Sequence, residues 1–123
     1  VDDSIVRGTS SKILVRDKMK SAEAVSLLID FPPILYPCYM GIDFPTREEL
    51  LAYRVCKAAQ SLEEINEKVG REIGVNFLGY NDVEGLSRGI GLPKEEFCLA
   101  CTTGDYSCLK YKPNFKTREE MKS

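Results

Sequence analysis

The feature that most restricts the fold is the unbroken apolar centre of AVSLLIDF, residues 24–31. A strand with one wet face alternates apolar and polar residues, whereas a continuous apolar run predicts burial on both faces, as in a parallel sheet. A second strand is expected at VNFLGY, residues 75–80. Helical segments lie before and between the two strands, and this order predicts an α/β fold with a parallel sheet flanked by helices.

Residues that favour helix starts and helix ends predict where the helices lie. The stretch PPILYPCYMGIDFP, residues 32–45, is a loop because prolines and a glycine interrupt it. TREELLAYRVC and SLEEINEKVG each begin with the capping-box pattern, in which a hydroxyl residue is followed three positions later by Glu. We therefore expect helices from Thr9 or Ser10 to about Ser21, from Thr46, from Ser61, and from Asp82 to a stop at Gly91 and Pro93.

Composition excludes several classes of protein. A length of 123 residues corresponds to one domain at most. The net charge of −2, with acids and bases interspersed, gives no basic surface for nucleic acid or an anionic membrane. No apolar run is long enough to span a bilayer and the first residues do not resemble a signal peptide, so a cytoplasmic protein is expected.

The chain has no histidine and five cysteines. The absence of histidine removes the commonest general base and any Ser–His or Cys–His nucleophile pair within this chain. An odd number of cysteines cannot all pair within the chain, which favours a reducing compartment. Chemistry must then depend on carboxylates, thiolates, hydroxyls or a bound metal.

The first residues, VDDSIVRGTSS, have the residue types of a phosphate site. Gly8, Thr9 and Ser10 precede an expected helix, whose unpaired amides and dipole favour an anion. Arg7 adds a forked cationic donor, and Asp2 and Asp3 can accept hydrogen bonds from sugar hydroxyls or hold hydrated Mg²⁺. The alternative is an ordinary strand-to-helix turn in which these residues only cap the helix, and residue types alone do not separate the two.

Three of the cysteines form a second candidate site. Cys98 and Cys101 have the Cys-x-x-Cys spacing of many metal sites, and Cys38 in the proline-rich loop is a third candidate ligand. Spacing alone favours plain thiols or a zinc site over an iron–sulfur cluster, and a Cys98–Cys101 redox pair lacks a thioredoxin-like context. Cys56 and Cys108 are expected to be plain buried or surface thiols.

The chain resembles the amidophosphoribosyltransferases in three sequence motifs: DDSIVRGT, PPILYPCYMGIDFPTREEL and FCLACTTGDY. The first motif is similar to the phosphoribosylpyrophosphate (PRPP) loop of type I phosphoribosyltransferases. The resemblance implies the C-terminal part of that parallel-sheet fold with a helical, cysteine-bearing extension. Residues 1–44 would hold the PRPP loop, helix, strand and Cys38 loop, and residues 45–123 the helical region, Cys-x-x-Cys turn and tail.

The resemblance also implies an activity. Such enzymes release ammonia from glutamine in an N-terminal glutaminase domain and transfer it to PRPP, giving 5-phosphoribosylamine, glutamate and pyrophosphate, the first step of de novo purine synthesis. By position, Asp2 and Asp3 would contact ribose and Mg²⁺, and the phosphate loop would be Ser4, Ile5, Val6, Arg7, Gly8, Thr9 and Ser10. The chain would lack the glutaminase domain and be inactive alone. The alternatives are a cysteine-rich metal-binding module and a non-catalytic phosphoribosyltransferase-like protein that binds nucleotides.

A cofactor and partners follow from the same resemblance. Some members bind a [4Fe-4S] cluster through cysteines at the positions of Cys38, Cys98 and Cys101 and one upstream cysteine, so the fourth ligand would lie outside this chain. Purine nucleotides are implied as feedback inhibitors and a homo-oligomer as the assembly of the whole enzyme. The carboxylates Glu48, Glu49, Glu63 and Glu64 lie in expected first helical turns and are interpreted as solvated.

Overall fold

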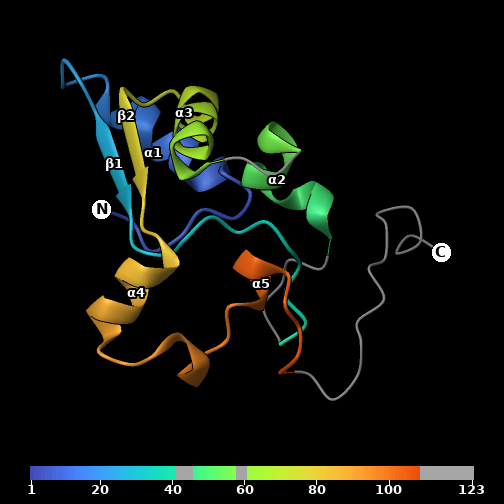
Figure 1. The fold of residues 1–123 in the computed structure, drawn as a ribbon. Helices are drawn as coiled ribbons and strands as arrows, with labels where there is room; N and C mark the ends of the chain where they lie inside the picture. Colours follow the sequence, from blue (N-terminus) through green and yellow to red (C-terminus); the bar gives the residue numbers. More distant parts are fainter. Residues whose placement is uncertain (41–45, 58–60, 109–123) are drawn as a thin grey trace.

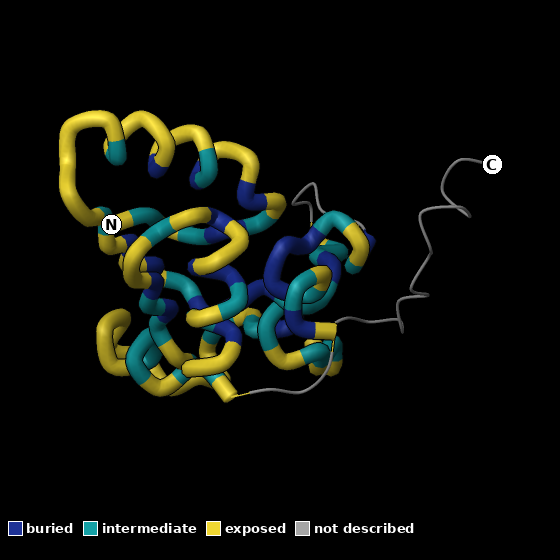
Figure 2. Tube along the Cα trace, turned by 90° about the horizontal axis from the view of Figure 1, so that it is seen from above, coloured by how far each residue is buried: buried dark blue, intermediate teal, exposed yellow. Residues whose placement is uncertain are grey.

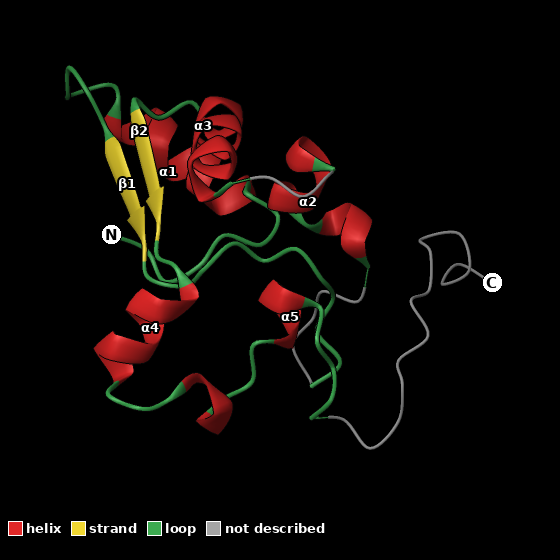
Figure 3. Ribbon diagram, viewed as in Figure 1, coloured by secondary structure: helices red, strands yellow, loops and turns green. Residues whose placement is uncertain are grey.

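The computed structural model describes residues 1–40, 46–57 and 61–108. Helices precede, separate and follow the strands β1 and β2 (Figures 1 and 3). Their bounds are α1 Thr9–Lys18, β1 Ser26–Ile29, the 3₁₀ helix η1 Arg47–Glu49, α2 Leu51–Cys56, α3 Leu62–Ile73, β2 Phe77–Tyr80, α4 Val83–Ile90, the 3₁₀ helix η2 Lys94–Glu96 and α5 Ala100–Thr103.

The two strands pair in parallel, which confirms the predicted α/β class. The register runs from Ser26 opposite Phe77 to Ile29 opposite Tyr80. The first residues of the chain lie along β1 as well, because the Asp2 amide donates to the Leu28 carbonyl at 2.9 Å. Successive carbonyls of a strand point to opposite sides, so residues 1–3 and β2 flank β1 on its two edges.

Only one face of this sheet is covered by the described helices. Its inward residues belong to one apolar core with α1, α2 and α3, formed by Ile5, Val15, Leu27, Ile29, Leu51, Ala52, Cys56, Ile65, Val69, Ile73, Leu78 and Tyr80. On the other face, Leu28 is 49% exposed and Phe77 is 57% exposed. The prediction of burial on both faces is therefore wrong for the described residues, in which buried positions alternate with exposed or partly exposed ones along each strand. Figure 2 shows the buried residues toward the middle of the fold and the exposed ones on its outer turns.

The capping-box prediction holds at one of its two positions. At α3, Ser61 Oγ accepts from the Glu64 amide and Glu64 Oε2 accepts from the Ser61 amide, both at 3.2 Å. At Thr46 no such bond forms, and the chain makes η1 before α2 begins. The Thr46 hydroxyl is buried without a hydrogen-bond partner among the described residues.

The remaining helix boundaries differ by a few residues from expectation. Helix α1 has Gly8, not Thr9 or Ser10, at its N-cap, and it ends at Lys18. Helix α4 begins after Asp82, whose carboxylate accepts from the Gly85 amide, and ends at left-handed Gly91, as predicted. No helix in the described ranges is long and apolar enough to cross a membrane.

The two hydroxyl residues give a matched stability test. Ser61→Ala removes a cap and should lower the free energy of unfolding by about 1 kcal/mol. Thr46→Val replaces an unpaired buried hydroxyl by a group of the same shape and should leave stability unchanged or raised. Urea unfolding measures both, and a larger loss for Thr46→Val would contradict the described geometry.

Candidate functional site

The two N-terminal acids lie at the carboxyl end of the parallel sheet. The Asp30 amide donates to the Asp2 carbonyl at 3.1 Å and the Phe31 amide to the Asp3 carbonyl at 2.9 Å. Ligands of open α/β sheets bind in the crevice outside the carboxyl ends of the strands. The main chain thus places both acids where such a ligand is expected.

Their carboxylates organise the start of the loop. Asp2 Oδ1 accepts from the Asp3 amide at 3.0 Å, and Asp3 Oδ1 accepts from the Ser4 hydroxyl at 3.2 Å. Asp3 is exposed and Asp2 is half-buried. Each carboxylate keeps further lone pairs for hydroxyl donors or a hydrated cation.

The loop after the acids packs against the core and against α2. Ile5 is only 2% exposed and is part of the main core, so its side chain is structural rather than ligand-binding. The Val6 carbonyl accepts from the Leu51 amide at 2.8 Å. Main-chain atoms of the loop are therefore fixed by a helix that begins more than 40 residues later.

Gly8 is required by both its backbone and its surroundings. Its φ of 80° lies in the left-handed region, and a Cβ there would collide with the Leu51 side chain. Leu51 is 1% exposed and cannot move into solvent. A residue without a side chain thus lets the loop lie directly on α2 and turn into α1.

The amides at the N-terminus of α1 are unpaired. Within the described residues, the amides of Gly8, Thr9 and Ser10 have no hydrogen-bond acceptor, and the side chains of Thr9 and Ser10 are exposed. No acidic side chain occupies the first turn of this ten-residue helix. Unpaired amides, adjacent hydroxyls and the positive end of the helix dipole together suit a phosphate dianion.

The Arg7 side chain reaches Glu49, the last residue of η1. Its Nη2 lies 3.6 Å from Glu49 Oε2, a separation for an ion pair but not for a hydrogen bond. Its carbonyl accepts from Arg54 Nη2 at 3.4 Å. The interpretation of Glu49 as a solvated carboxylate is wrong, since that oxygen is buried at the loop.

Leu51, Glu49 and Arg54 are thus loop-supporting residues that the sequence did not reveal. They act on residues more than 40 positions away, and no local pattern marks such a contact. Glu63 and Glu64, which were also expected to be solvated, are exposed on the first turn of α3.

The proline-rich loop packs against α2 and α5 as a second cluster. Ile34 and Leu50 are buried there, with Cys38 and Cys101 partly buried against them. The Cys101 carbonyl accepts from the amides of both Leu35 and Tyr36 at 2.9 Å. The guanidinium of Arg47 lies over the rings of Tyr36 and Tyr53, 4.7 Å and 4.2 Å from their centroids. These contacts join the Cys38 loop to the Cys-x-x-Cys turn.

The cysteines do not form a ready metal site. Burial raises the pKa of the Cys101 thiol. Cys98 is exposed, and its sulfur lies 3.9 Å from that of Cys108. In the part of the chain that the structure describes, no three Cys, Asp or Glu side chains are grouped as metal ligands.

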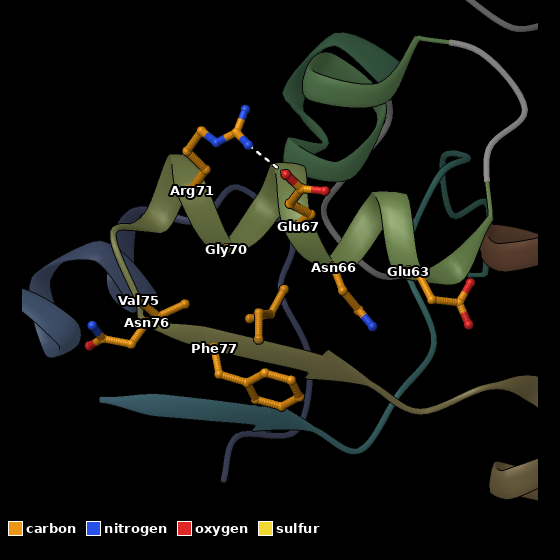
Figure 4. A pocket seen from close by; sticks show the side chains of 9 residues that line it. Glu63, Asn66, Glu67, Gly70, Arg71, Val75, Asn76 and Phe77 are labelled. Carbon is orange, nitrogen blue, oxygen red and sulfur yellow. Dashed lines mark hydrogen bonds and ion pairs between the residues drawn. The ribbon is translucent and has the colours of Figure 1, made fainter. Parts of the chain in front are cut away.

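A hollow of about 490 Å³ lies away from these residues, between α3 and β2 (Figure 4). Asn66 projects toward β2 and accepts from the Tyr80 amide at 2.9 Å, while Arg71 and Glu67 form an ion pair at 2.6 Å. The side chains of Asn66, Glu67 and Arg71 are thus already paired, and the hollow holds no predicted site residue.

The sequence is similar to those of known enzymes. A scan of protein-family models finds no match. The amidophosphoribosyltransferase of Methanocaldococcus jannaschii is 44% identical over 107 residues, covering 86% of this chain and 20% of that protein. That of Bacillus subtilis is 44% identical over 111 residues, covering 86% of this chain and 21% of its own length.

The chain is homologous to one segment of the amidophosphoribosyltransferases. It spans about a fifth of the length of these relatives. A solved structure, the B. subtilis glutamine PRPP amidotransferase complexed with ADP and GMP, superposes with a TM-score of 0.62 at 39% identity. The match covers 85% of this chain and 22% of that one, and it supports the phosphoribosyltransferase fold.

The amidophosphoribosyltransferase segment offers a matched test of its loop. Gly8→Ala imposes left-handed strain and displaces buried Leu51, whereas Gly74→Ala imposes the strain alone, since nothing lies within 4 Å of a Cβ at Gly74. The left-handed conformation costs a residue with a Cβ about 1–2 kcal/mol. Forcing an extra carbon into the core should destabilise Gly8→Ala by about 1 kcal/mol or more beyond Gly74→Ala.

Urea unfolding of the two variants measures this difference. Equal losses of stability would show that Leu51 yields without cost and does not support the loop.

Proposed function

We propose that this segment provides the PRPP-binding loop of an amidophosphoribosyltransferase. The observation that carries the proposal is the set of unpaired amides at Gly8, Thr9 and Ser10, directly after two acids at the carboxyl end of a parallel sheet. The identity of about 44% to enzymes of that name supports it. The same amides would hold the 5-phosphate, and Asp2 and Asp3 would accept from the ribose hydroxyls.

The proposed reaction of the whole enzyme is ammonia transfer. Ammonia released from glutamine attacks C1 of PRPP while the bond from C1 to pyrophosphate breaks, and the new amine then loses a proton to give 5-phosphoribosylamine. Ammonia is already a nucleophile and pyrophosphate already a good leaving group. Catalysis would therefore depend mainly on positioning and electrostatic stabilisation, which a segment without histidine can provide.

In this mechanism the chain's own residues fix the sugar. The loop amides hold the 5-phosphate at one end, and the acids hold the hydroxyl side at the other, so C1 presents one face to ammonia. Gly8 and Leu51 keep those amides in place through the close contact of loop and helix. A displacement of the loop would misalign both groups at once.

The donor set of Asp2 and Asp3 fits Mg²⁺, which prefers carboxylate oxygens and retains several waters. Both carboxylates have lone pairs beyond the bonds to Asp3 and Ser4 described above. Bound there, Mg²⁺ would neutralise negative charge on the leaving pyrophosphate.

A purine nucleoside 5′-phosphate presents the same phosphate and ribose groups as PRPP. The B. subtilis relative is complexed with ADP and GMP. We therefore propose that such nucleotides compete for the amides of Gly8, Thr9 and Ser10, which would give the whole enzyme feedback inhibition.

A [4Fe-4S] cluster on Cys38, Cys98 and Cys101, with a fourth ligand outside this chain, stays a prediction. The described arrangement does not fit a preformed site, because Cys98 contacts Cys108 and no three ligand side chains are grouped. No catalytic step depends on it, and the cysteines do not favour a metal-binding module as a separate function.

Asp3→Asn, introduced into a whole enzyme that carries this segment, tests the assignment. Loss of the carboxylate charge should weaken hydrogen bonds worth about 1.5–3 kcal/mol, so kcat/KM for PRPP should fall about 10- to 100-fold. Steady-state kinetics at saturating glutamine give the value.

The matched control is Asp17→Asn, which makes the same change at an exposed position in the last turn of α1. Its kinetics should equal those of the parent. If Asp3→Asn also leaves kcat/KM for PRPP unchanged, the acids do not bind the sugar and the assignment fails.

A further inference from the structure

A side chain of α2 contacts the main chain of the loop that carries the unpaired amides. Arg54 Nη2 donates to the Arg7 carbonyl oxygen at 3.4 Å. The two residues are 47 positions apart, so no local pattern predicts the contact. The separation is long for a neutral hydrogen bond, but this donor carries a full positive charge, and charge-assisted hydrogen bonds are the stronger class.

Helix α2 supplies donors to two successive carbonyls of the loop. The Val6 carbonyl accepts from the main-chain amide of Leu51 at 2.8 Å, and the next carbonyl, that of Arg7, accepts from the Arg54 side chain. The first bond fixes the loop on the helix whatever side chain follows. The second bond can be removed by a substitution while the first remains.

The Arg7 carbonyl belongs to the same peptide group as the Gly8 amide. That peptide group is trans, so its C=O and N–H bonds lie in one plane and point in opposite directions. Because the carbonyl is held toward Arg54 on α2, the Gly8 N–H points away from that side chain. Within the described residues this N–H has no acceptor, and it is the first of the unpaired amides at the start of α1.

The contact also changes the strength of that donor. The carbonyl and the amide share one delocalised electron system, so a positive charge at the oxygen draws electron density away from the nitrogen. Hydrogen bonds linked in this way reinforce one another. An anion at the Gly8 amide and the guanidinium at the Arg7 carbonyl would therefore strengthen each other's binding.

An anion of α3 lies near the Arg54 guanidinium. Lys12 of α1 donates to Glu72 Oε1 at 2.6 Å. This hydrogen bond and the charge of Lys12, followed by the charge of Arg54, lower the pKa of the Glu72 carboxyl. Arg54 is itself exposed, so a substitution there leaves the core residues of α2 in place.

We propose that Arg54 is a positioning residue for the 5-phosphate of PRPP, which orients and polarises the peptide group between Arg7 and Gly8. This inference rests on the proposed function, because it names a residue that tunes its phosphate-binding amides. The 5-phosphate is remote from C1, where bonds change, so the Gly8 amide binds it equally in the ground state and the transition state. Loss of Arg54 should therefore raise the KM for PRPP and leave kcat unchanged.

Steady-state kinetics of a whole enzyme that carries this segment test the role. Arg54→Met removes the charge and the donor but keeps a good helix former, and the KM for PRPP should rise about 5-fold, the effect of one hydrogen bond. Arg54→Lys keeps a positive charge and a donor, so it should recover most of the affinity.

The matched control is Arg71→Met, which removes an exposed guanidinium that pairs with Glu67 on α3. Its KM for PRPP should equal that of the parent. An unchanged KM in Arg54→Met, a fall in kcat at unchanged KM, or no recovery in Arg54→Lys would overturn the positioning role.

The carbonyl ¹³C chemical shift of Arg7 in the labelled chain reports the contact without any ligand. Loss of a hydrogen bond at a carbonyl oxygen lowers this shift. Arg54→Met should therefore move the Arg7 carbonyl resonance upfield and change that of the Gly8 amide, whereas Arg71→Met should move neither. An Arg7 carbonyl shift that is the same in Arg54→Met and the parent would show that the contact does not act on this peptide group.

Failure of the proposed function has a different signature. If Asp3→Asn leaves kcat/KM for PRPP unchanged, the assignment of the PRPP loop fails. If Asp3→Asn lowers kcat/KM while Arg54→Met keeps the parent's KM, that assignment stands and only the positioning role of Arg54 is overturned.

Discussion

The contact between Gly8 and Leu51 determines the conformation of the loop for which we propose PRPP binding. Leu51 is buried and its amide binds the Val6 carbonyl, so the loop rests on α2 along both main chain and side chain. Gly8 alone permits the close approach and the left-handed turn into α1. The orientation of the unpaired amides at Gly8, Thr9 and Ser10 therefore depends on this packing contact.

A second set of contacts connects that helix to the cysteine-bearing turn. Arg47, just before α2, stacks with Tyr36 of the proline-rich loop, and the Cys101 carbonyl binds two amides of the same loop. The two candidate sites are thus held by neighbouring parts of one scaffold. Cys98 and Cys108 are exposed at its surface.

Local sequence signals predicted much of the fold because their physical causes are local. The parallel strands, the Ser61 cap and the Asp82 helix follow from apolar runs and hydrogen-bonding side chains within a few positions. At Thr46 the residues that follow form the 3₁₀ helix η1 without a side-chain cap, and Glu49 lies near Arg7. The support from Leu51 and the Cys98–Cys108 contact arise from tertiary folding, which spacing along the chain does not encode.

The most direct test of the account is an NMR titration of the ¹⁵N-labelled chain with ribose 5-phosphate in the presence of Mg²⁺. Unpaired amides at the start of α1 should bind the phosphate, so saturable shifts should centre on Gly8, Thr9 and Ser10. Absence of saturable shifts at these amides, or shifts centred on the hollow between α3 and β2, would contradict the account.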